Sequence, residues 1–490
     1  MKYILAIDQG TTSSRALIFN NYGKVEFKSQ VEVECQFPHS GWVEQNALDV
    51  WVSVLNVVND ALAKMNITVD DIHAIGITNQ RETTVIWDKK TGLPVYNAIV
   101  WQSRQSADIC ERWQPYKELI HSKTGLILNP YFSASKIRFI LDHIERGQER
   151  AENGELMFGT IDTWLMYKLS KGKIFKTEVS NASRTMLFNI NTLKYDNELL
   201  KIFNIPKKML PKVEESYAYF GDALFLKKGL PIHGVAGDQQ AALFGQNCFD
   251  AGQSKSTYGT GCFMLLNTGT KPIFSSNGII TTIAWTLNGE TKYALEGSVF
   301  MGGACVQWLR DQLKLIKTSS ESEQCALNVR NDLGVYVVPA FVGLGAPYWD
   351  DDCKGAVFGL TRGTTKDHFI RAVLNSIAYQ VKDVIDVMEK EGNLKIESLK
   401  VDGGATSNRY LMQFQSDILG SQIIIPECLE TTALGVAYLA GLGSGYWISL
   451  DEIKKIHSIK EIYKPTMEQE EIDKKYRKWK KAVETTRMFK

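Results

Sequence analysis

A polar loop near the start of the chain has the residue types that hold phosphate groups. Asp8 and Gly10 follow an apolar run that begins at Ile4, a run of threonine and serine comes next, and apolar residues resume at Ala16. The short apolar runs predict a hairpin of two strands, with Gly10 in a left-handed turn. Converging N–H groups and hydroxyls are suited to bind a chain of phosphates. The carboxylate of Asp8 would repel the phosphates unless a cation such as Mg²⁺ lay between them. For this run alone, a polar hairpin on an edge strand is an equally good interpretation.

A second stretch of the same kind extends from Ser254 to Leu266. Hydroxyl residues and glycines again lead into an apolar strand. One phosphate-binding hairpin at the start of each half indicates an internal duplication, with a nucleotide held between the halves. This layout is similar to that of the actin-like and sugar-kinase ATPases.

A third candidate is Asp238, which stands between a short apolar strand, 235–237, and a helix that begins near Ala241. In open α/β sheets, ligands bind outside the carboxyl ends of strands, where this residue is expected. Its carboxylate could accept the proton of a substrate hydroxyl as that oxygen attacks the γ-phosphate. An N-cap role at the helix start is the ordinary alternative, and the two roles are compatible. We expect the domain boundary just beyond this point, near residues 247–253.

Arg81 and Glu82 lie between strands predicted at 72–77 and 85–87. They could form a surface ion pair of little energetic value. In the wall of a cleft, a carboxylate beside a guanidinium group would instead suit a vicinal polyol, whose hydroxyls donate and accept hydrogen bonds. Trp101 could cover the carbon chain of such a substrate, or it could pack in the core. Tyr131 follows a turn-forming pair of residues that places it at the start of a helix.

Glycines at two helix starts are candidates for a nucleotide pocket. Gly302 and Gly303 precede a predicted helix, and adjacent glycines allow a flat ring to approach the backbone. Gly403 and Gly404 follow a strand predicted at 399–401 and could form a floor for adenine and ribose. A Gly-Gly turn is weak support by itself.

Helices are expected to support these loops. Asn46 is a good N-cap for a helix whose apolar residues recur every three or four positions, and a second amphipathic helix is expected at 369–388. Residues 119–162 are expected to be mainly helical. The last helix is predicted to begin with a capping box of Thr466 and Gln469 and to continue as a solvated helix to Arg487.

The composition indicates a globular protein that acts on small molecules. With 490 residues, of which 44% are hydrophobic, the chain is long enough for two to three domains. Lys and Arg (56) balance Asp and Glu (55), which gives no reason to expect a nucleic acid or membrane-surface partner. The eight cysteines form no C-x-x-C pair and are expected to be reduced, and the histidines have no zinc-ligand spacing. Without a long apolar segment, we expect a soluble cytoplasmic protein.

Four motifs together resemble the FGGY carbohydrate kinases of the actin-like ATPase superfamily, and among them the glycerol kinases. They begin at Ile7 (IDQGTTSSR), Gly76 (GITNQRETT), Gly237 (GDQQAALFG) and Val401 (VDGGA). The second and third are typical of kinases that act on glycerol, and the resemblance covers nearly the whole chain. It implies an α/β fold of two ribonuclease H-like domains, residues 1–248 and 249–490, with the active site in the cleft between them.

The resemblance also implies roles for individual residues. Asp238 matches the catalytic base, and Asp8 matches the residue that reaches Mg²⁺ through its water shell. The positions that match the glycerol site are Arg81, Glu82, Trp101, Tyr131, Asp238, Gln239 and Phe263. The positions that match the ATP site are Thr11, Thr12, Ser13, Arg15, Thr260, Gly303, Gln307, Gly404 and Asn408.

The activity that the resemblance implies is phosphorylation of glycerol by Mg·ATP, in a homodimer or homotetramer. A pentulose or other polyol kinase of the same family is the nearest alternative, because it would share both hairpins. An actin-like or chaperone-like ATPase is a more distant one, since it needs no acceptor pocket with a buried base. Residues 219–229 have neither the basic glycine-rich loop that binds fructose 1,6-bisphosphate in some relatives nor the histidine that is phosphorylated in others.

Overall fold

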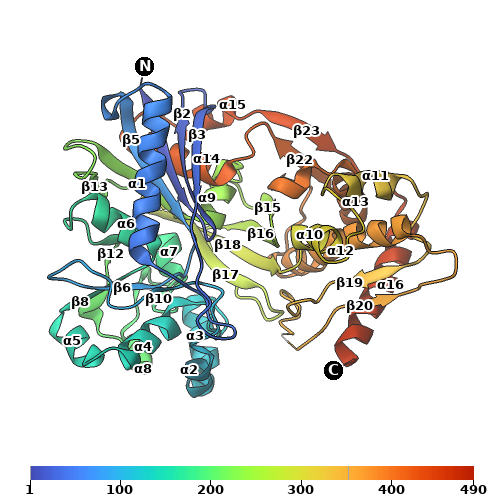
Figure 1. Ribbon diagram of the computed structural model, residues 1–490, viewed down its shortest axis with the longest axis horizontal. Coiled ribbons are helices and arrows are strands. Elements are labelled where there is room, and N and C mark those ends of the chain that lie inside the picture. The colour runs from blue at the N-terminus through green and yellow to red at the C-terminus, as the bar shows by residue number, and fades with distance from the viewer. Residues whose placement is uncertain (1, 351, 490) are drawn as a thin grey trace.

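The computed structural model describes residues 2–350 and 352–489, and it contains two mixed sheets with helices packed around and between them (Figure 1). The first sheet has six strands, in the spatial order β13 (Gly221–Asp222), β14 (Pro231–Gly237), β5 (Ile72–Asn79), β1 (Tyr3–Gln9), β2 (Ser13–Phe19) and β3 (Val25–Glu32). The second has seven, in the order β17 (Ile280–Leu287), β18 (Glu290–Val299), β16 (Cys262–Gly269), β15 (Ser254–Tyr258), β21 (Ser398–Asp402), β22 (Gln422–Pro426) and β23 (Ile459–Tyr463).

The two sheets repeat one arrangement. In the first, β1 and β2 form an antiparallel hairpin and β5 runs parallel to β1; in the second, β15 and β16 form the hairpin and β21 runs parallel to β15. The strands β1, β5 and β14 are parallel and end together, because Asn79 pairs with both Gln9 and Gly237. Both predicted hairpins and the α/β fold class are confirmed.

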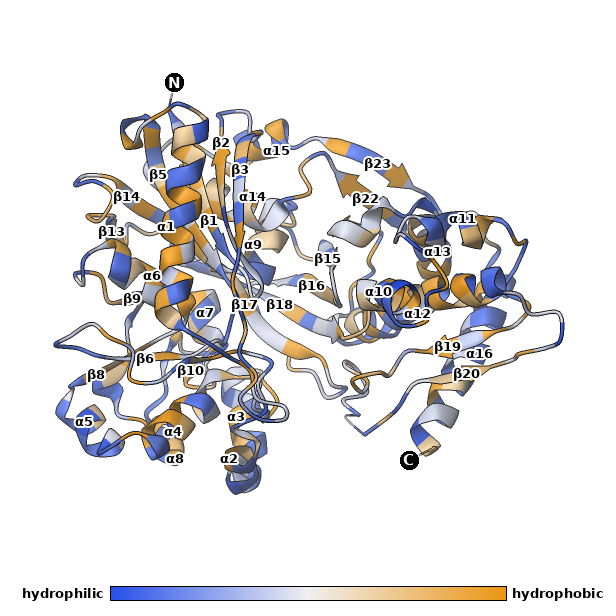
Figure 2. Ribbon diagram, in the orientation of Figure 1, coloured by the Kyte–Doolittle hydropathy of each residue, from blue (hydrophilic) through white to orange (hydrophobic). Residues whose placement is uncertain are grey.

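Alternating side chains of β1 pack against helices on opposite faces of the first sheet. Leu5 and Ile7 contact a cluster formed with α1 (Ala47–Lys64) and α6 (Ile161–Leu169), whereas Ile4 and Ala6 contact α9 (Asp238–Gly245) and α14 (Thr431–Ser444). This is the period-two pattern of a strand buried on both faces. Asn46 caps α1 as predicted, and Figure 2 shows hydrophobic and hydrophilic residues on different sides of that helix.

The helices α9 and α14 cross each other closely between the two sheets. A Cβ atom at Gly435 would collide with the carbonyl of Ala241, and one at Gly245 would collide with the carbonyl of Thr431. Glycine is therefore required where the two backbones meet. Because α9 also contacts β15 and β16, the end of the first half of the chain is packed against the second sheet.

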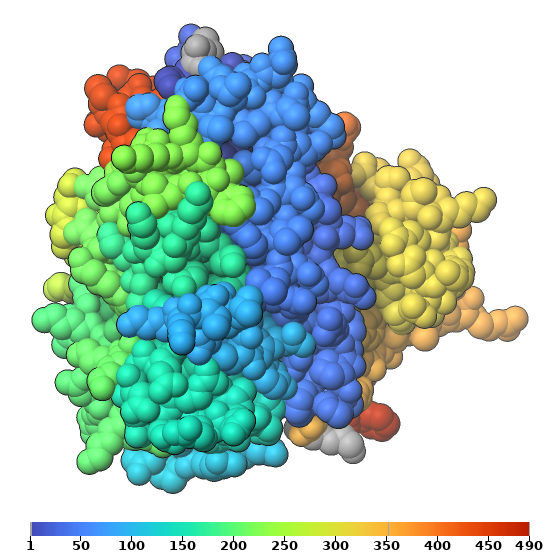
Figure 3. Space-filling model, turned by 60° about the vertical axis from the view of Figure 1, so that its left-hand side comes forward, coloured from blue at the N-terminus to red at the C-terminus, as the bar shows by residue number. Residues whose placement is uncertain are grey.

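The second sheet is covered by α12 (Lys366–Gly392), which includes the predicted helix at 369–388. The remaining helices flank the sheets, and in Figure 3 the segment in yellow, which includes α10 and α11, lies on the right-hand side of the molecule. Their bounds are α2 (Ala107–Arg112), α3 (Lys117–Thr124), α4 (Ser133–His143), α5 (Gly147–Asn153), α7 (Val179–Ser183), α8 (Asn197–Phe203), α10 (Gly303–Asp311), α11 (Glu321–Leu327), α13 (Arg409–Leu419), α15 (Leu450–Ile456) and α16 (Gln469–Met488). Short two-stranded sheets pair β4 (Glu44–Gln45) with β7 (Ala98–Ile99), β6 (Val85–Asp88) with β8 (Leu156–Gly159), β9 (Lys176–Glu178) with β12 (Lys212–Glu214), β10 (Phe188–Asn189) with β11 (Lys194–Tyr195), and β19 (Tyr336–Val338) with β20 (Ala356–Phe358).

Residues 119–162 are mainly helical, as predicted, with the short strand β8 between α5 and α6. Two other local predictions were wrong. Gly10 does not adopt a left-handed conformation, and its N–H closes the hairpin by donating to the carbonyl of Ser13 at 2.9 Å. Thr466 does not cap α16 but donates to the carboxylate of Asp417, and Trp479 of that helix is fully buried rather than solvated.

Among the described residues, the eight cysteines form no disulfide. Within residues 2–350 and 352–489, none of the helices combines the length and the hydrophobicity that crossing a lipid bilayer requires.

Candidate active site

The first hairpin turn is held by glutamine side chains and a tryptophan. Gln45 donates to the carbonyl of Thr11 at 2.6 Å, and Gln80 donates to the side-chain oxygens of Gln45 and Gln9 at 2.8 and 3.0 Å. The indole N–H of Trp101 donates to the Thr11 hydroxyl at 2.8 Å. Because that hydroxyl accepts from Trp101, its own hydrogen remains available to donate to an anion. Thr12 is exposed at the tip of the turn, while Ser13 is buried where β2 begins.

Asp238 is the first residue of α9, directly after the carboxyl end of β14, as predicted. It is not the N-cap, since Gly237 occupies that position, and its Oδ1 accepts from the N–H of Gln239 at 2.7 Å. The Nε of Arg81 lies 3.2 Å from Oδ1, and the side chain is 31% exposed. Burial raises the pKa of the Asp238 carboxyl, while the positive charges of Arg81 and Lys255 oppose that rise. The carboxylate is therefore accessible and has the properties of a general base.

Arg81 belongs to a buried network of charges and not to a surface ion pair. Its two Nη atoms donate to both carboxylate oxygens of Glu296, at 2.5 and 2.8 Å. Arg184 joins the network, with Nη2 3.0 Å from Glu296 and Nε 2.6 Å from Glu82. All four residues are at most 3% exposed. Such a bidentate arrangement fixes the plane of the Arg81 guanidinium group.

The two glutamates of this network differ in their pKa. Burial alone would raise the pKa of Glu296, but the guanidinium groups of Arg184 and Arg81 lower it to about 2. Burial outweighs the same two cations at Glu82, whose pKa is raised. Glu82 also has a positive φ of 59°, a strained backbone conformation of the kind found at functional sites.

Three aromatic rings form a wall beside these charges. Trp101 makes edge-to-face contacts with Tyr131 at 5.4 Å and with Phe263 at 6.4 Å between ring centroids. Phe263 lies on β16, so the wall combines rings from both halves of the chain. The Cζ atom of Arg184 lies 5.6 Å from the centre of the Tyr131 ring, which joins the wall to the charged network. The structure thus brings the predicted glycerol-site residues together.

Lys255 on β15 is a further member of the site. Its buried Nζ donates to the side-chain oxygen of Gln239 and, at 3.0 Å, to the Thr257 hydroxyl. Burial lowers the pKa of Lys255 to about 8, against the opposing effect of Asp402 and Asp238. The ammonium group therefore holds Gln239 next to Asp238.

Glu296, Arg184 and Lys255 were missed by the sequence analysis. The signal available for Glu296 was a charge between Leu295 and Gly297 in the otherwise uncharged run 293–299. Charged residues are seldom fully buried unless they are paired, so a charge at the centre of a buried strand predicts a partner. The sequence does not indicate which residue that partner is.

The predicted nucleotide residues form two groups. Thr260 lies in the turn of the second hairpin, where its carbonyl accepts from the N–H groups of Gly302 and Ala304 at 2.9 and 3.1 Å. Gly303 begins α10 and donates to the carbonyl of Gly259 at 2.8 Å, and Gln307 is exposed one turn along that helix.

The second group follows β21. Gly404 is exposed in a 3₁₀ turn, and Asn408 caps α13 while it donates to the Ser322 hydroxyl at 3.2 Å. The backbone of Gly403, with φ 93°, packs against Tyr258 next to the turn of the second hairpin. Within the described ranges, no hydrogen bond joins Gly404 or Asn408 to the Thr260 turn.

Asp8 lies near the carboxyl end of β1, in surroundings that suit a cation. Its side chain is largely buried, with 8% of the residue exposed. The Nη1 atom of Arg15 lies 3.6 Å from Oδ2 of Asp8 and 3.4 Å from Oε2 of Glu430. Burial raises the pKa of Asp8 to about 6; Arg15 opposes this rise, while Asp238 and Glu430 add to it. In the part of the chain that the structure describes, no three His, Cys, Asp or Glu side chains gather as a metal site. A cation here would need phosphate and water oxygens as its further ligands.

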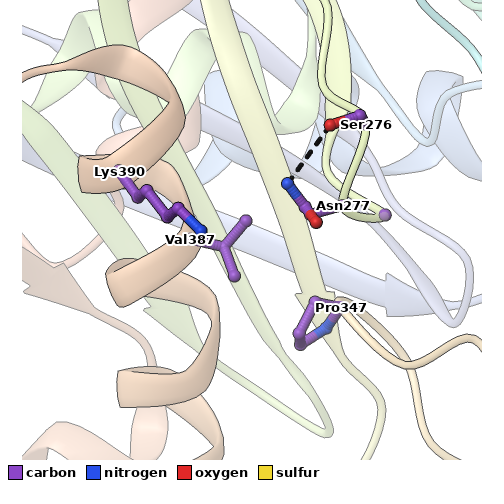
Figure 4. Close-up of a pocket in the computed structure, with 6 residues that line it drawn as sticks. Ser276, Asn277, Pro347, Val387 and Lys390 are labelled. Carbon is purple, nitrogen blue, oxygen red and sulfur yellow. Dashed lines mark hydrogen bonds between the residues drawn. The ribbon is translucent and has the colours of Figure 1, made fainter.

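A pocket of about 370 Å³ lies elsewhere, between residues 276–278, Pro347 and the end of α12 (Figure 4). Val387 and Lys390 of α12 face it, and none of the predicted site residues lines it. This pocket is therefore separate from the cluster around Asp238.

The fold and this cluster define the class of protein. The model of the FGGY family of carbohydrate kinases, N-terminal domain, matches residues 3–245, and the model of its C-terminal domain matches residues 255–444. The chain belongs to the FGGY family of carbohydrate kinases.

Individual relatives and solved structures show which members of the family the chain is similar to. The chain is 56% identical to a glycerol kinase of Bacillus licheniformis, over the full length of both, and 56% identical to one of a Geobacillus species over the same extent. Among solved structures, it is similar to Plasmodium falciparum glycerol kinase with ADP, with a TM-score of 0.93 and 37% identity over 99% of this chain and 98% of that one. A xylulose kinase of Lactobacillus acidophilus shares the fold, with a TM-score of 0.86 and 22% identity.

Proposed function

We propose that this chain transfers the γ-phosphoryl group of ATP to glycerol, giving sn-glycerol 3-phosphate and ADP, in glycerol uptake and catabolism. The observation that carries the proposal is the position of Asp238, whose carboxylate lies 3.2 Å from Arg81 and beside a three-ring wall. Glycerol kinases that match the whole chain at 54–56% identity support it.

In the proposed reaction, Asp238 accepts the proton of the terminal hydroxyl as the oxygen attacks phosphorus. Arg81 and Glu82 bind the other hydroxyls, one as donor and one as acceptor, and Gln239 assists from α9. Trp101, Tyr131 and Phe263 cover the carbon chain. A three-carbon polyol can fill the space along such a wall while its oxygens face the charged network.

The two hairpins would bind the phosphates, because polar turns of this kind offer backbone N–H groups and hydroxyls to an anion. The proposed phosphate contacts are Thr11, Thr12, Ser13, Arg15 and Thr260, and the proposed adenosine contacts are Gly303, Gln307, Gly404 and Asn408. The relative from Plasmodium falciparum with ADP supports the use of ATP. Exclusion of water from the site would limit wasteful hydrolysis.

Asp8 would hold Mg²⁺ through water molecules. Its buried carboxylate, with Asp238 and Glu430 as neighbouring negative charges, fits a divalent cation that also contacts the phosphates. When bound, Mg²⁺ neutralises charge on the β- and γ-phosphates.

Three further assignments accompany the reaction. The domains are proposed as residues 1–248, with the glycerol site, and 249–490, with the adenosine pocket. The expected assembly is a homodimer or homotetramer. The expected location is the cytoplasm, where ATP is supplied.

The test is ADP release from purified protein with Mg·ATP, with and without glycerol, and in parallel with dihydroxyacetone and a pentulose. Strong stimulation by glycerol, with glycerol 3-phosphate as the product, is expected. A pentulose that outcompetes glycerol would show that the Arg81 and Glu82 assignment is wrong. ATP turnover that no polyol changes would favour an ATPase with another role.

A further inference from the structure

Lys136 is a fully buried lysine that the proposed reaction does not use. It lies in the first turn of α4, and its Nζ donates to the backbone carbonyls of Pro130, Tyr131 and Phe132 at 2.6, 2.5 and 3.3 Å. An ammonium group has three N–H donors, so these three carbonyls use all of them.

The position is unfavourable for a cation by itself. The N-terminal end of a helix repels positive charge, and burial removes the solvation of the ammonium group. Among the described residues, no carboxylate forms an ion pair with Lys136. The stability of α4 therefore does not explain the presence of a lysine at this position. Its hydrogen bonds to the three carbonyls explain it.

Those carbonyls belong to the turn that presents Tyr131 to the site. On the other side of the turn, the Tyr131 N–H donates to Asn129 at 2.9 Å. Two residues further on, Ser133 donates its hydroxyl to the carbonyl of Glu82 at 3.1 Å. The Tyr131 ring then meets Trp101 edge to face. The backbone of Tyr131 is thus held from both sides, by Lys136 and by Asn129.

We propose that Lys136 is a positioning residue of the glycerol subsite: its ammonium group holds the carbonyls of residues 130–132 and thereby fixes the Tyr131 ring. The inference rests on the proposed function, since it concerns the subsite assigned to glycerol. Lys136 touches neither substrate nor the reacting atoms. Its loss should let the ring move away from Trp101, which weakens glycerol binding and leaves the nucleotide hairpins unchanged.

The arrangement should respond to pH. Burial lowers the pKa of Lys136 to about 7, with Glu82 and Cys110 opposing this shift. Above that pH the amine has lost one proton, so one of the three carbonyls loses its charge-assisted donor. Of the groups that face Lys136, Glu82 from the loop after β5 is tied to Arg184, and burial raises the pKa of Cys110 on α2 to about 11. Cys110 therefore stays neutral between pH 6 and 9.

The first experiment compares Lys136→Met with the wild type in steady-state kinetics at pH 6.5. The KM for glycerol should rise about tenfold or more, the effect of one lost ordering contact, while the KM for ATP and kcat at saturating glycerol change less than about twofold. An unchanged glycerol KM in a folded variant would overturn the proposal. A wild type that glycerol does not stimulate would instead overturn the proposed function.

A double-mutant cycle with Tyr131→Ala tests whether Lys136 acts through the ring. If it does, Lys136→Met should add less than about twofold to the glycerol KM once the ring is absent, whereas independent effects that multiply would overturn the proposal. Lys168→Met is the matched control, because this half-buried lysine of α6 lies over the Trp164 ring at 5.2 Å and, among the described residues, forms no hydrogen bond or ion pair with the subsite. Its kinetics should equal those of the wild type.

If Lys136→Met does not fold, the pH dependence of the glycerol KM tests the proposal instead. The glycerol KM of the wild type should rise between pH 6 and 9, and this rise should be smaller in Tyr131→Ala. A rise of equal size in both proteins would overturn the proposal, because it would show that the titrating group does not act through the ring.

Discussion

Replacement of Glu296 by glutamine should damage both stability and activity. The carboxylate accepts three hydrogen bonds, two from Arg81 at 2.5 and 2.8 Å and one from Arg184 at 3.0 Å, and its side chain is fully buried. Glutamine keeps the volume, so no cavity forms, but its amide NH₂ group must face a guanidinium N–H. Removing one partner of a buried ion pair costs about 3–5 kcal/mol, because the remaining charge stays buried without compensation. We expect a loss of that size in the free energy of unfolding.

The activity should fall because Arg81 loses the group that fixes its plane. Its Nε lies 3.2 Å from Asp238, so a freed guanidinium group can turn toward the base and away from the substrate hydroxyls. Urea unfolding followed by circular dichroism measures the first effect, and glycerol-dependent ADP release measures the second, with an expected decrease in kcat/KM of about tenfold or more.

The control for Glu296→Gln is Glu149→Gln, which removes the carboxylate of an exposed ion pair with Arg146. Exposed pairs contribute roughly 0–1 kcal/mol, so this variant should unfold like the wild type. If Glu296→Gln lowered the free energy of unfolding by less than about 1 kcal/mol and kept the wild-type kcat/KM, the argument that Arg81 depends on Glu296 would be refuted.

Three other predictions concern the base, the helix crossing and acid stability. Asp238→Asn should lower kcat by about 10²- to 10⁴-fold while ATP binding persists, because an amide cannot accept the proton; activity within tenfold of wild type in the ADP assay would remove Asp238 from the mechanism. Gly435→Ala should lower the free energy of unfolding by about 1–3 kcal/mol or more, since the new methyl group collides with the carbonyl of Ala241, and an unchanged urea midpoint would contradict the tight crossing of α9 and α14. The pKa of Glu296 falls from the ordinary 4.5 to about 2 on folding, so its stabilisation is complete above pH 4.5 and is lost as the pH falls toward 2. The stability difference between wild type and Glu296→Gln should shrink over that range, and a constant difference would count against the assigned charge state.

The elements that could be predicted are those specified by neighbouring residues. Apolar runs on either side of a polar loop indicated both hairpins, and Asn46 followed by a three- and four-residue apolar repeat indicated α1. The position of Asp238 after a short apolar strand placed it correctly at the carboxyl end of β14. In each case the residues that determine the element lie close together in the sequence, so the local sequence is sufficient to predict it.

The parts that could not be predicted depend on partners far apart in the chain. Arg81 and Glu296 are separated by 215 positions, and no local pattern shows that they meet. The same reason accounts for Thr466, which satisfies the spacing of a capping box but bonds instead to Asp417, 49 positions away. Where a distant carboxylate offers a better acceptor, tertiary contact overrides local preference.

Glu296 of the second half pairs with Arg81 and Arg184 of the first half, and these ion pairs explain how the site is held together. Three cations stand against three carboxylates, so the buried cluster is neutral overall: Arg81, Arg184 and Lys255 against Glu82, Glu296 and Asp238. Glu296 and Lys255 lie on strands of the second sheet, and the other four lie in the first half of the chain. Without the first half, Glu296 would lose both guanidinium partners, and a buried carboxylate without its cations is costly in a low-dielectric interior. The geometry around Asp238 therefore depends on the packing of the two halves against each other. A change in that packing should alter the position of the Asp238 carboxylate.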